Sequence, residues 1–514
     1  MAYTNTTLDQ YVPQGRRLIL LLALVLTVTV SLGALAAQSP TLAIAAAVAA
    51  LLSFVIIAWP DVSTLAVVFL IYSNLAVVAV KFHNVPYAIG SSVPALLIIP
   101  LASYLIVKRQ KLVINPVLPF IFLYLVIHLV STLFSEHLDI AVTTLVQFAI
   151  EGFGLYFLIN NLIRTPKMLR RVVWALLIAG MIMGGVPIYQ QLTGTFENNY
   201  GGLGQTSVET FSTGVEDIEG EIGQYRLAGT IGEQNRYAQV MLMLMPLAFF
   251  QIWGERSYWL RILAAAATGI IIMGGALAFS RGAAVGFVLL VVIVGFMGYI
   301  KPYQIAIILA GMMLVLWAVP QYGNRLNTLQ ALPSVADSDT AGIDEADSST
   351  QSRVTEMLAA GLVFVDYPLL GVGPGAFGQY YEEYGNRVGI RVKSGRTREA
   401  HSLYPEIAAE LGGFGLVCFL AIVVLTLRNL ALARKRWLLL RPELAYMATG
   451  FMLAIVSYMM TGIFLHMSFI RFFWLMMALA GAASTIIAEA DTPVEAVPDK
   501  KIVPGSLDRR ESTL

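Results

Sequence analysis

The chain has 514 residues, of which 57% are hydrophobic and only 13% are charged, and its mean hydropathy is +0.73. A soluble domain of this length cannot bury so much apolar surface, so the composition excludes an ordinary soluble protein and predicts a polytopic membrane protein. The formal net charge of +1 points to no partner, and nucleic acid is not expected to be one. The single cysteine excludes an intrachain disulfide.

About fourteen apolar runs follow one another along the chain, each of roughly 15 to 23 residues, which is the length that crosses the apolar core of a bilayer. They begin near Leu18, Thr41, Val62, Val93, Pro116, Ala141, Val172, Tyr237, Leu260, Gly282, Tyr303, Leu403, Leu444 and Ile470. We therefore expect an all-α polytopic membrane protein with about fourteen transmembrane helices.

Two long polar connections divide the chain into six segments. The expected segments are about seven transmembrane helices in 1–192, a first extracytoplasmic loop in 193–236, about four helices in 237–320, a large extracytoplasmic loop in 321–403, about three helices in 404–488, and an unstructured cytoplasmic tail in 489–514. The large loop is expected to contain short amphipathic helices. One of them ends near Asp366, because Pro368 follows closely.

Lysine and arginine gather on alternate connections between the predicted helices. The short connections on the opposite side hold only Lys81, Arg281 and Arg471. By the positive-inside rule, both termini are expected in the cytoplasm and both long loops on the outer side of the membrane.

Three arginines stand at the predicted outer ends of membrane helices: Arg226 in "YRLAGTIGEQNRYA", Arg281 in "AFSRGAAVGF" and Arg471 in "HMSFIRFFW". Ionisable residues at the membrane are costly and tend to be functional, although each arginine alone also suits snorkelling to the interface or pairing with a lipid phosphate. Guanidinium groups bind phosphate oxygens bidentately and stay charged. Convergence of the three on one face therefore indicates an anion site, and a cluster of this kind suits a pyrophosphate.

A histidine and two glutamates occupy "REAHSLYPEIAAELGGFGL", where the large loop enters a membrane helix. His401 has the chemistry of a general base, and an interfacial histidine with a structural hydrogen bond is the alternative. If the helix begins near Leu403, Glu406 and Glu410 are one turn apart and share a face. Either glutamate can orient the histidine or pair with an arginine.

Neither a metal nor a nucleotide cofactor is expected. The other histidines, His83, His128, His137 and His466, are scattered without the spacing of metal ligands. The run "GVGPG" at 371–375 lacks the Lys-Ser/Thr of a P-loop, so we interpret it as a turn.

Four motifs together resemble the O-antigen ligase and Wzy-type O-antigen polymerase superfamily. They are "QSRVTEMLAAGLVFVDYPLLGVGPGAF", "AHSLYPEIAAELGGFGL", "RLAGTIGEQNRYA" and "SRGA", and the likeness extends roughly from Arg226 to Leu416. Ser402 departs from the pattern, since asparagine is commoner there. About fourteen spans are also more than a typical ligase has, which leaves the choice between ligase and polymerase open.

The resemblance implies a metal- and nucleotide-independent membrane glycosyltransferase of the GT-C type. Its donor would be a saccharide on undecaprenyl pyrophosphate, and its acceptor a glycan or lipid A-core. It also implies a place in the bacterial cytoplasmic (inner) membrane, with the active site facing the periplasm or exterior, contact with membrane lipid, and a chain-length regulator or a flippase as further partners.

The resemblance and the chemistry of the residues together predict a mechanism. Arg226 and Arg281 bind the pyrophosphate, with Arg353 or Arg471 as a helper, because arginines oriented in advance stabilise the charge of the leaving group. His401 removes the proton from the acceptor hydroxyl, which attacks the anomeric carbon with inversion.

Glu410, or alternatively Glu406, is expected to orient this histidine or the acceptor. A polytopic transporter or flippase for an anionic lipid-linked or envelope substrate is the rival class, because many spans with membrane arginines also suit a carrier. A scaffold of a polysaccharide assembly complex is a third class, and it would need neither the histidine nor the arginines.

Overall fold

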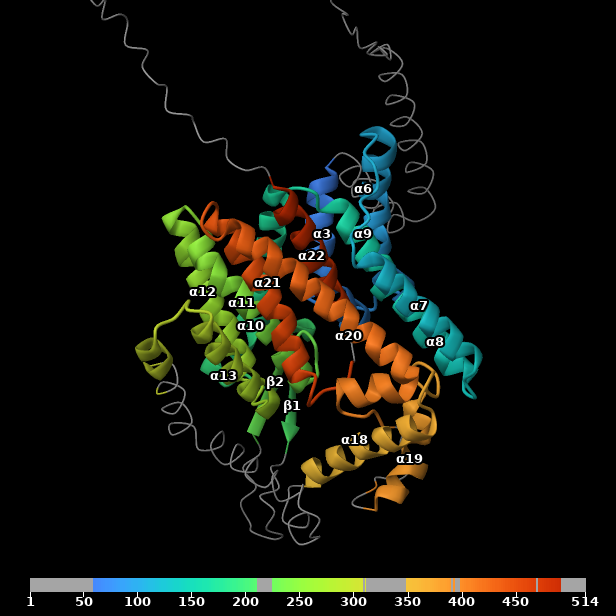
Figure 1. The fold of residues 1–514 in the computed structure, drawn as a ribbon. Helices are drawn as coiled ribbons and strands as arrows, with labels where there is room; N and C mark the ends of the chain where they lie inside the picture. Colours follow the sequence, from blue (N-terminus) through green and yellow to red (C-terminus); the bar gives the residue numbers. More distant parts are fainter. Residues whose placement is uncertain are drawn as a thin grey trace, which may run out of the picture.

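The computed structural model describes residues 59–209, 224–307, 348–389, 398–467 and 470–490, with positions 310 and 392. The predicted spans near Leu18 and Thr41, most of the one near Tyr303, the centre of the large loop and the tail lie outside these residues. The described part is a bundle of helices with one small sheet (Figure 1). The expectation of a mostly helical membrane protein is confirmed.

The helices up to the first long loop are short in several places. In chain order they are α3 (Pro60–Tyr72), α4 (Leu75–Phe82), α5 (Tyr87–Ser91), the 3₁₀ helix η1 (Val93–Leu97), α6 (Ile98–Ala102), the π-helix η2 (Ser103–Val107), α7 (Leu118–Leu133), α8 (Leu138–Gln147), the π-helix η3 (Phe148–Gly154), α9 (Leu155–Leu162) and α10 (Pro166–Thr193).

The sheet and the remaining helices follow. They are the 3₁₀ helix η4 (Tyr200–Gly202), the antiparallel strands β1 (Gln205–Glu209) and β2 (Gln224–Gly229), α11 (Gln234–Gly254), α12 (Tyr258–Ala276), α13 (Arg281–Phe296), α18 (Ser348–Asp366), α19 (Phe377–Val388), α20 (Leu403–Trp437), α21 (Pro442–Thr461) and α22 (Ile470–Glu489).

The expected number of about fourteen spans is not confirmed. Within the described residues, seven helices are long and apolar enough to cross a membrane, and α3 with α4 make an eighth if this pair, bent by 60°, counts as one span. The chain bends there at Asn74, whose φ of 61° is left-handed. Three other predicted runs form shorter apolar helices, at Val93–Ile106, Leu118–Leu133 and Arg281–Phe296. Hydropathy alone counts each such run as one span, because it does not register bends and breaks.

Helices α11 and α22 form the centre of the bundle. In their most apolar stretches 78% and 83% of the residues are buried, against 28% in α12. A helix that is apolar on every side suits such a central position. Helix α22 is rich in small residues, and a Cβ at Gly481 would collide with the Tyr156 ring of α9. Small residues thus let these helices approach closely.

The two long connections lie at the same end of the bundle (Figure 1). The strands β1 and β2 of the first connection and the helices α18 and α19 of the second all appear at the lower end of this view. This arrangement agrees with the expectation that both loops share one face. The side of the membrane on which that face lies stays a prediction.

A separate small core holds the helices of the large loop together. Buried side chains from α18, α19 and the first turns of α20 pack against one another there, among them Val363, Phe377, Tyr381 and Ala409. Helix α18 ends at Asp366, as predicted, because the residue before Pro368 is disfavoured in helical conformation. We call this unit, residues 348–389 with 398–411, the loop lobe.

The glycine turn of the loop lobe is locked to a kink in α20. Gly371 and Gly412 have φ values of 67° and 65°, and a Cβ on either would collide with the backbone of the other segment. Backbone hydrogen bonds join the segments, from Gly373 N to Glu410 O at 3.0 Å and from Gly413 N to Pro368 O at 2.7 Å. The prediction of a turn at 371–375 is confirmed, and only glycine fits such a close backbone approach.

Candidate active site

His401 occupies the short segment through which the loop lobe enters α20. Its φ is 48°, in the left-handed region that a residue with a side chain seldom adopts. The neighbouring side chains of Ala400 and Ser402 are fully buried, and Leu403 N donates to Gly462 O at 2.8 Å. Strain of this kind persists only where the surrounding structure enforces it, and it is found most often at functional sites.

Two oxygen atoms approach the same ring nitrogen of His401. Its Nδ1 lies 2.9 Å from Glu356 Oε2 and 3.1 Å from the carbonyl oxygen of Glu399. Only the carbonyl contact has the angles of a hydrogen bond, so the Glu356 contact is an electrostatic one. A proton on Nδ1 is donated to the Glu399 carbonyl, lies beside the Glu356 carboxylate and leaves Nε2 as the basic nitrogen. The side chain is 28% exposed, and so accessible to an acceptor.

Glu356 is a buried carboxylate supplied by α18. Its side chain is only 1% exposed, and its second oxygen, Oε1, lies 3.4 Å from an amino nitrogen of Arg398. The helix presents it on the same face as the buried Thr355, Ala359 and Val363, which pack into the loop lobe. Burying a carboxylate is costly unless it is paired, and both of its partners belong to the segment that enters α20.

A second histidine lies beside the first. The ring of His466, from the connection between α21 and α22, is 5.4 Å from the ring of His401 and contacts the carboxylate of Glu399 through Nε2. Burial, together with Arg236 and His401, lowers the pKa of His466 well below its ordinary value.

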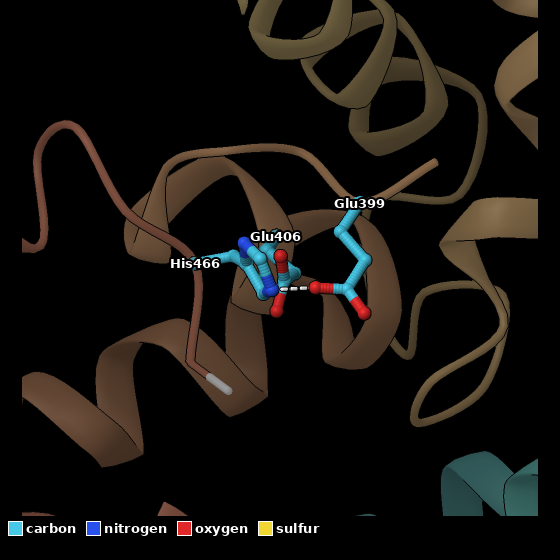
Figure 2. Close-up of side chains that lie close together, drawn as sticks. All are labelled: Glu399, Glu406 and His466. Atoms are coloured by element: carbon cyan, nitrogen blue, oxygen red, sulfur yellow. Dashed lines mark ion pairs between the residues drawn. The ribbon is translucent and has the colours of Figure 1, made fainter. Parts of the chain in front are cut away.

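Glu399, Glu406 and His466 bring three potential metal-ligand atoms within 4.8 Å of one another (Figure 2). Two carboxylates and an imidazole are donors that divalent metals accept. The charge of Arg236 acts on both Glu406 and His466, however, and it offsets negative charge that a cation would otherwise neutralise. These residues are the part of the described chain that can hold a metal, and the expectation of a metal-free site stays a prediction.

Glu410 has partners other than His401. Its carboxylate accepts hydrogen bonds from the backbone N–H groups of Gly375 and Phe377, at the start of α19. Carboxylates are favourable at a helix N-terminus, so Glu410 anchors α19 to α20. The carboxylate next to His401 is Glu356 instead.

Arg226 contacts the segment between α12 and α13. The Arg226 side chain is 1% exposed, and it donates from Nε to Ala278 O at 2.9 Å and from Nη2 to Asn235 Oδ1 at 3.1 Å. Arg281 is the first residue of α13, three positions after Ala278. A Cβ on the next residue, Gly282, would lie 3.4 Å from Phe464, close in the chain to His466. Arg226 thus contacts the segment before α13, and the residue after Arg281 lies near the connection that carries His466.

The other two predicted arginines differ in their surroundings. Arg471 donates to Asn74 Oδ1 at 2.7 Å and lies 3.9 Å from Glu151, so it ties the start of α22 to the bend of α3 and α4 and to η3. Arg353 lies on α18 one turn before Glu356, and side chains with this spacing are neighbours on a helix.

A comparison with models of known protein families identifies the family of one part of the chain. Residues 266–420 match the family model described as O-antigen ligase. These residues form an O-antigen ligase domain. The family predicted from the sequence motifs is thereby confirmed, while no curated protein matches the chain.

The O-antigen ligase domain contains most of the site described above. Arg281, Glu356, His401 and the Glu399–Glu406 pair lie inside the matched residues, whereas Arg226 precedes them and the connection with His466 follows them. The match supports a membrane enzyme of the O-antigen ligase or polymerase type, which acts on a lipid-linked glycan and an acceptor.

Sequence reasoning missed Glu356 and His466 as neighbours of His401. Glu356 had a signal: it is an acidic residue on the apolar face of an amphipathic helix, with Ala359 and Val363. His466 had none, because its distance from His401 along the chain gives no hint that two connections meet.

Proposed function

We propose that the protein moves a saccharide en bloc from an undecaprenyl-pyrophosphate carrier to a sugar hydroxyl of an acceptor, on the outer face of the bacterial cytoplasmic membrane. The observation that carries this proposal is the environment of the His401 ring within the O-antigen ligase domain. Its Nδ1 is held by a carbonyl and a carboxylate. A histidine held in this way presents a basic nitrogen to an acceptor.

In this mechanism the acceptor O–H bond breaks and its proton moves to Nε2 of His401. The freed oxygen forms a bond to the anomeric carbon of the donor, with inversion. The bond from that carbon to the carrier pyrophosphate breaks, and its electron pair stays on the pyrophosphate oxygen. No metal or nucleotide takes part in the proposed step, because the donor is already activated.

The negative charge on the departing pyrophosphate is the second task of the site. Arg281, at the first turn of α13, and Arg226, whose guanidinium is held against the segment before α13, are assigned to it. Charged donors that are oriented before the reaction stabilise a developing anion. Arg353, on α18 of the loop lobe, is one candidate helper. Arg471, which contacts Asn74 and Glu151, is the alternative helper.

The test is a transfer assay with purified protein in proteoliposomes, an undecaprenyl-pyrophosphate glycan and an acceptor glycan. Wild-type protein is expected to form a new glycosidic bond and release undecaprenyl pyrophosphate, both measured by mass spectrometry. Arg281→Ala should lower the rate about 100- to 1,000-fold, as removal of an oriented anion-stabilising donor does. Arg256→Ala is the matched control, since that side chain is 90% exposed and pairs with Glu443, away from the site.

The assay also separates the rival function. Accumulation of the lipid-linked glycan in the opposite leaflet without a new glycosidic bond would indicate a transporter or flippase. Near-normal transfer by both Arg281→Ala and His401→Ala would contradict the proposed mechanism.

A further inference from the structure

We propose that Glu356 is the residue that positions His401 for transfer, so that the loop helix α18 is a working part of the active site. This inference rests on the proposed function, because it assigns a partner to the base of that reaction. It replaces Glu410 in the role that the sequence suggested for a glutamate.

Glu356 is buried where it can act on His401. Its side chain is 1% exposed, and its oxygens face His401 Nδ1 at 2.9 Å and Arg398 at 3.4 Å. A carboxylate with this burial requires compensating partners. The chain supplies both within four residues of one another, at the entrance to α20, so Glu356 fixes the segment that carries the base.

The backbone of His401 is strained and depends on the contacts around it. A φ of 48° costs free energy for any residue with a Cβ and needs surrounding contacts to hold it. Glu356 and the Glu399 carbonyl approach Nδ1 together and set the direction of the ring. The loop lobe core, to which Ala400 belongs, holds the neighbouring backbone in place.

The charge of Glu356 suits the state that His401 enters during the reaction. When His401 accepts the proton of the acceptor hydroxyl, an imidazolium forms 2.9 Å from a buried carboxylate. The carboxylate carries the charge opposite to that of the imidazolium, so it stabilises the state that follows proton removal. Arg398 shares the carboxylate through the other oxygen and leaves Oε2 for the histidine.

The neighbouring carboxylates do not fit this role. Glu410 accepts backbone hydrogen bonds at the start of α19, and Glu406 accepts one from Met467 and lies in the Glu399–His466 group. Glu399 contributes its carbonyl to His401, while its carboxylate contacts His466. Glu356 is the carboxylate whose contacts in the described part of the chain join the base directly.

The experiment is a double-mutant cycle in the transfer assay, with Glu356→Gln, His401→Ala and the double variant. Glu356→Gln keeps the shape and removes the charge. It should lower kcat about 10- to 100-fold with little change in KM for donor or acceptor, as expected when a base loses its partner. In the His401→Ala background the same substitution should cause no further loss, because a residue that acts through His401 has nothing left to act on.

The controls separate positioning from folding. Glu382→Gln, an exposed carboxylate of α19, should keep wild-type kcat. Glu356→Asp, which keeps the charge on a shorter side chain, should recover part of the rate that Glu356→Gln loses. Thermal unfolding of each variant is measured in the same preparations. If Glu356→Gln is less stable than wild type, the deciding quantity is the ratio of kcat with and without Glu356→Gln when His401 is already alanine.

Wild-type kcat in Glu356→Gln would overturn the inference, and so would an equal loss of rate in both backgrounds, which indicates a purely structural role. The failure of the proposed function has a different signature. In that case His401→Ala itself would keep normal transfer, and the positioning role would fall with it.

Discussion

Two buried carboxylates, Glu255 and Glu356, are paired with arginine in different ways. Glu255 follows the end of α11 and accepts bonds from Arg170 Nε at 2.7 Å and from Trp174 Nε1 at 2.8 Å, with further bonds from Arg170 Nη2 and Gln251. Glu356 has looser contacts, at 2.9 Å and 3.4 Å, and one of its oxygens lacks a hydrogen bond of good geometry.

The difference shows what each carboxylate does. A glutamate that is saturated by a bidentate arginine and an indole has no capacity left for chemistry, and it fastens α10 to α11. A glutamate whose partners are a strained histidine and an arginine at 3.4 Å retains the capacity to respond when the histidine changes its charge. The loop lobe thus gives up local stability at the site where the reaction is proposed.

The largest effect on stability is expected from a substitution in the loop lobe, at Gly412. Gly412→Ala places a Cβ against the backbone of Leu369 and Leu370 and forces a side chain into a conformation reserved for glycine. We expect a loss of about 3 kcal/mol or more in the stability of the loop lobe, together with loss of transfer. The measurement is hydrogen exchange of α18 and α19, read beside the transfer rate.

The control for that substitution is Gly269→Ala in α12, where a Cβ meets no atom within 4 Å. It should leave both exchange and transfer unchanged. Normal exchange of α18 in Gly412→Ala would contradict the proposed locking of the turn to the kink.

A smaller loss of stability is expected when Glu255 loses its arginine partner. Arg170→Ala leaves Glu255 buried with the Trp174 and Gln251 bonds alone. We expect a loss of about 2 kcal/mol, less than for a wholly buried pair because the Arg170 side chain is 48% exposed. The midpoint of thermal unfolding in detergent should fall while kcat at permissive temperature stays near wild type. A reduced kcat without a change in midpoint would mean that this pair is not merely structural.

Acidification should remove the stability that the ionised Glu255 side chain contributes. Burial alone would raise the pKa of Glu255, but bonds from Arg170, Trp174 and Gln251 lower it below its ordinary value. A depressed folded-state pKa adds stability above the unfolded-state pKa, and this stability is lost as the pH falls through the folded-state pKa. The thermal midpoint of wild type should therefore fall more steeply on acidification than that of Glu255→Gln. Parallel curves would contradict the assignment.

The smallest expected effect concerns the joint between α18 and α19. Tyr384 donates to Asp366 Oδ2 at 2.7 Å, and this bond is the main cause that lowers the pKa of Asp366. Tyr384→Phe should lower the thermal midpoint slightly, and less than Arg170→Ala, because the Asp366 carboxylate is 45% exposed and water can replace the lost bond. Tyr189→Phe, at an exposed tyrosine of α10, is the control. An effect larger than that of Arg170→Ala would reverse the order proposed here.

The sequence predicts local features of the site better than its contacts. Pro368 explains why α18 ends at Asp366, and the polar entry before Leu403 marks the start of α20. The meeting of Glu356 with His401 depends on how α18 packs in the loop lobe, which no local pattern encodes. Glu410 is close to His401 in sequence, but the turn at 371–375 engages its carboxylate.

The most direct test of the account is the transfer rate of His401→Ala at saturating donor and acceptor, measured beside its thermal midpoint, with His83→Ala as the matched control. His83 is exposed and bonds only to Gly201 O among the contacts described for its ring nitrogens. We expect a loss of about 100- to 10,000-fold for His401→Ala, as expected for removal of a general base, in protein that still unfolds cooperatively, and normal transfer by the control. A rate within a few-fold of wild type would contradict it.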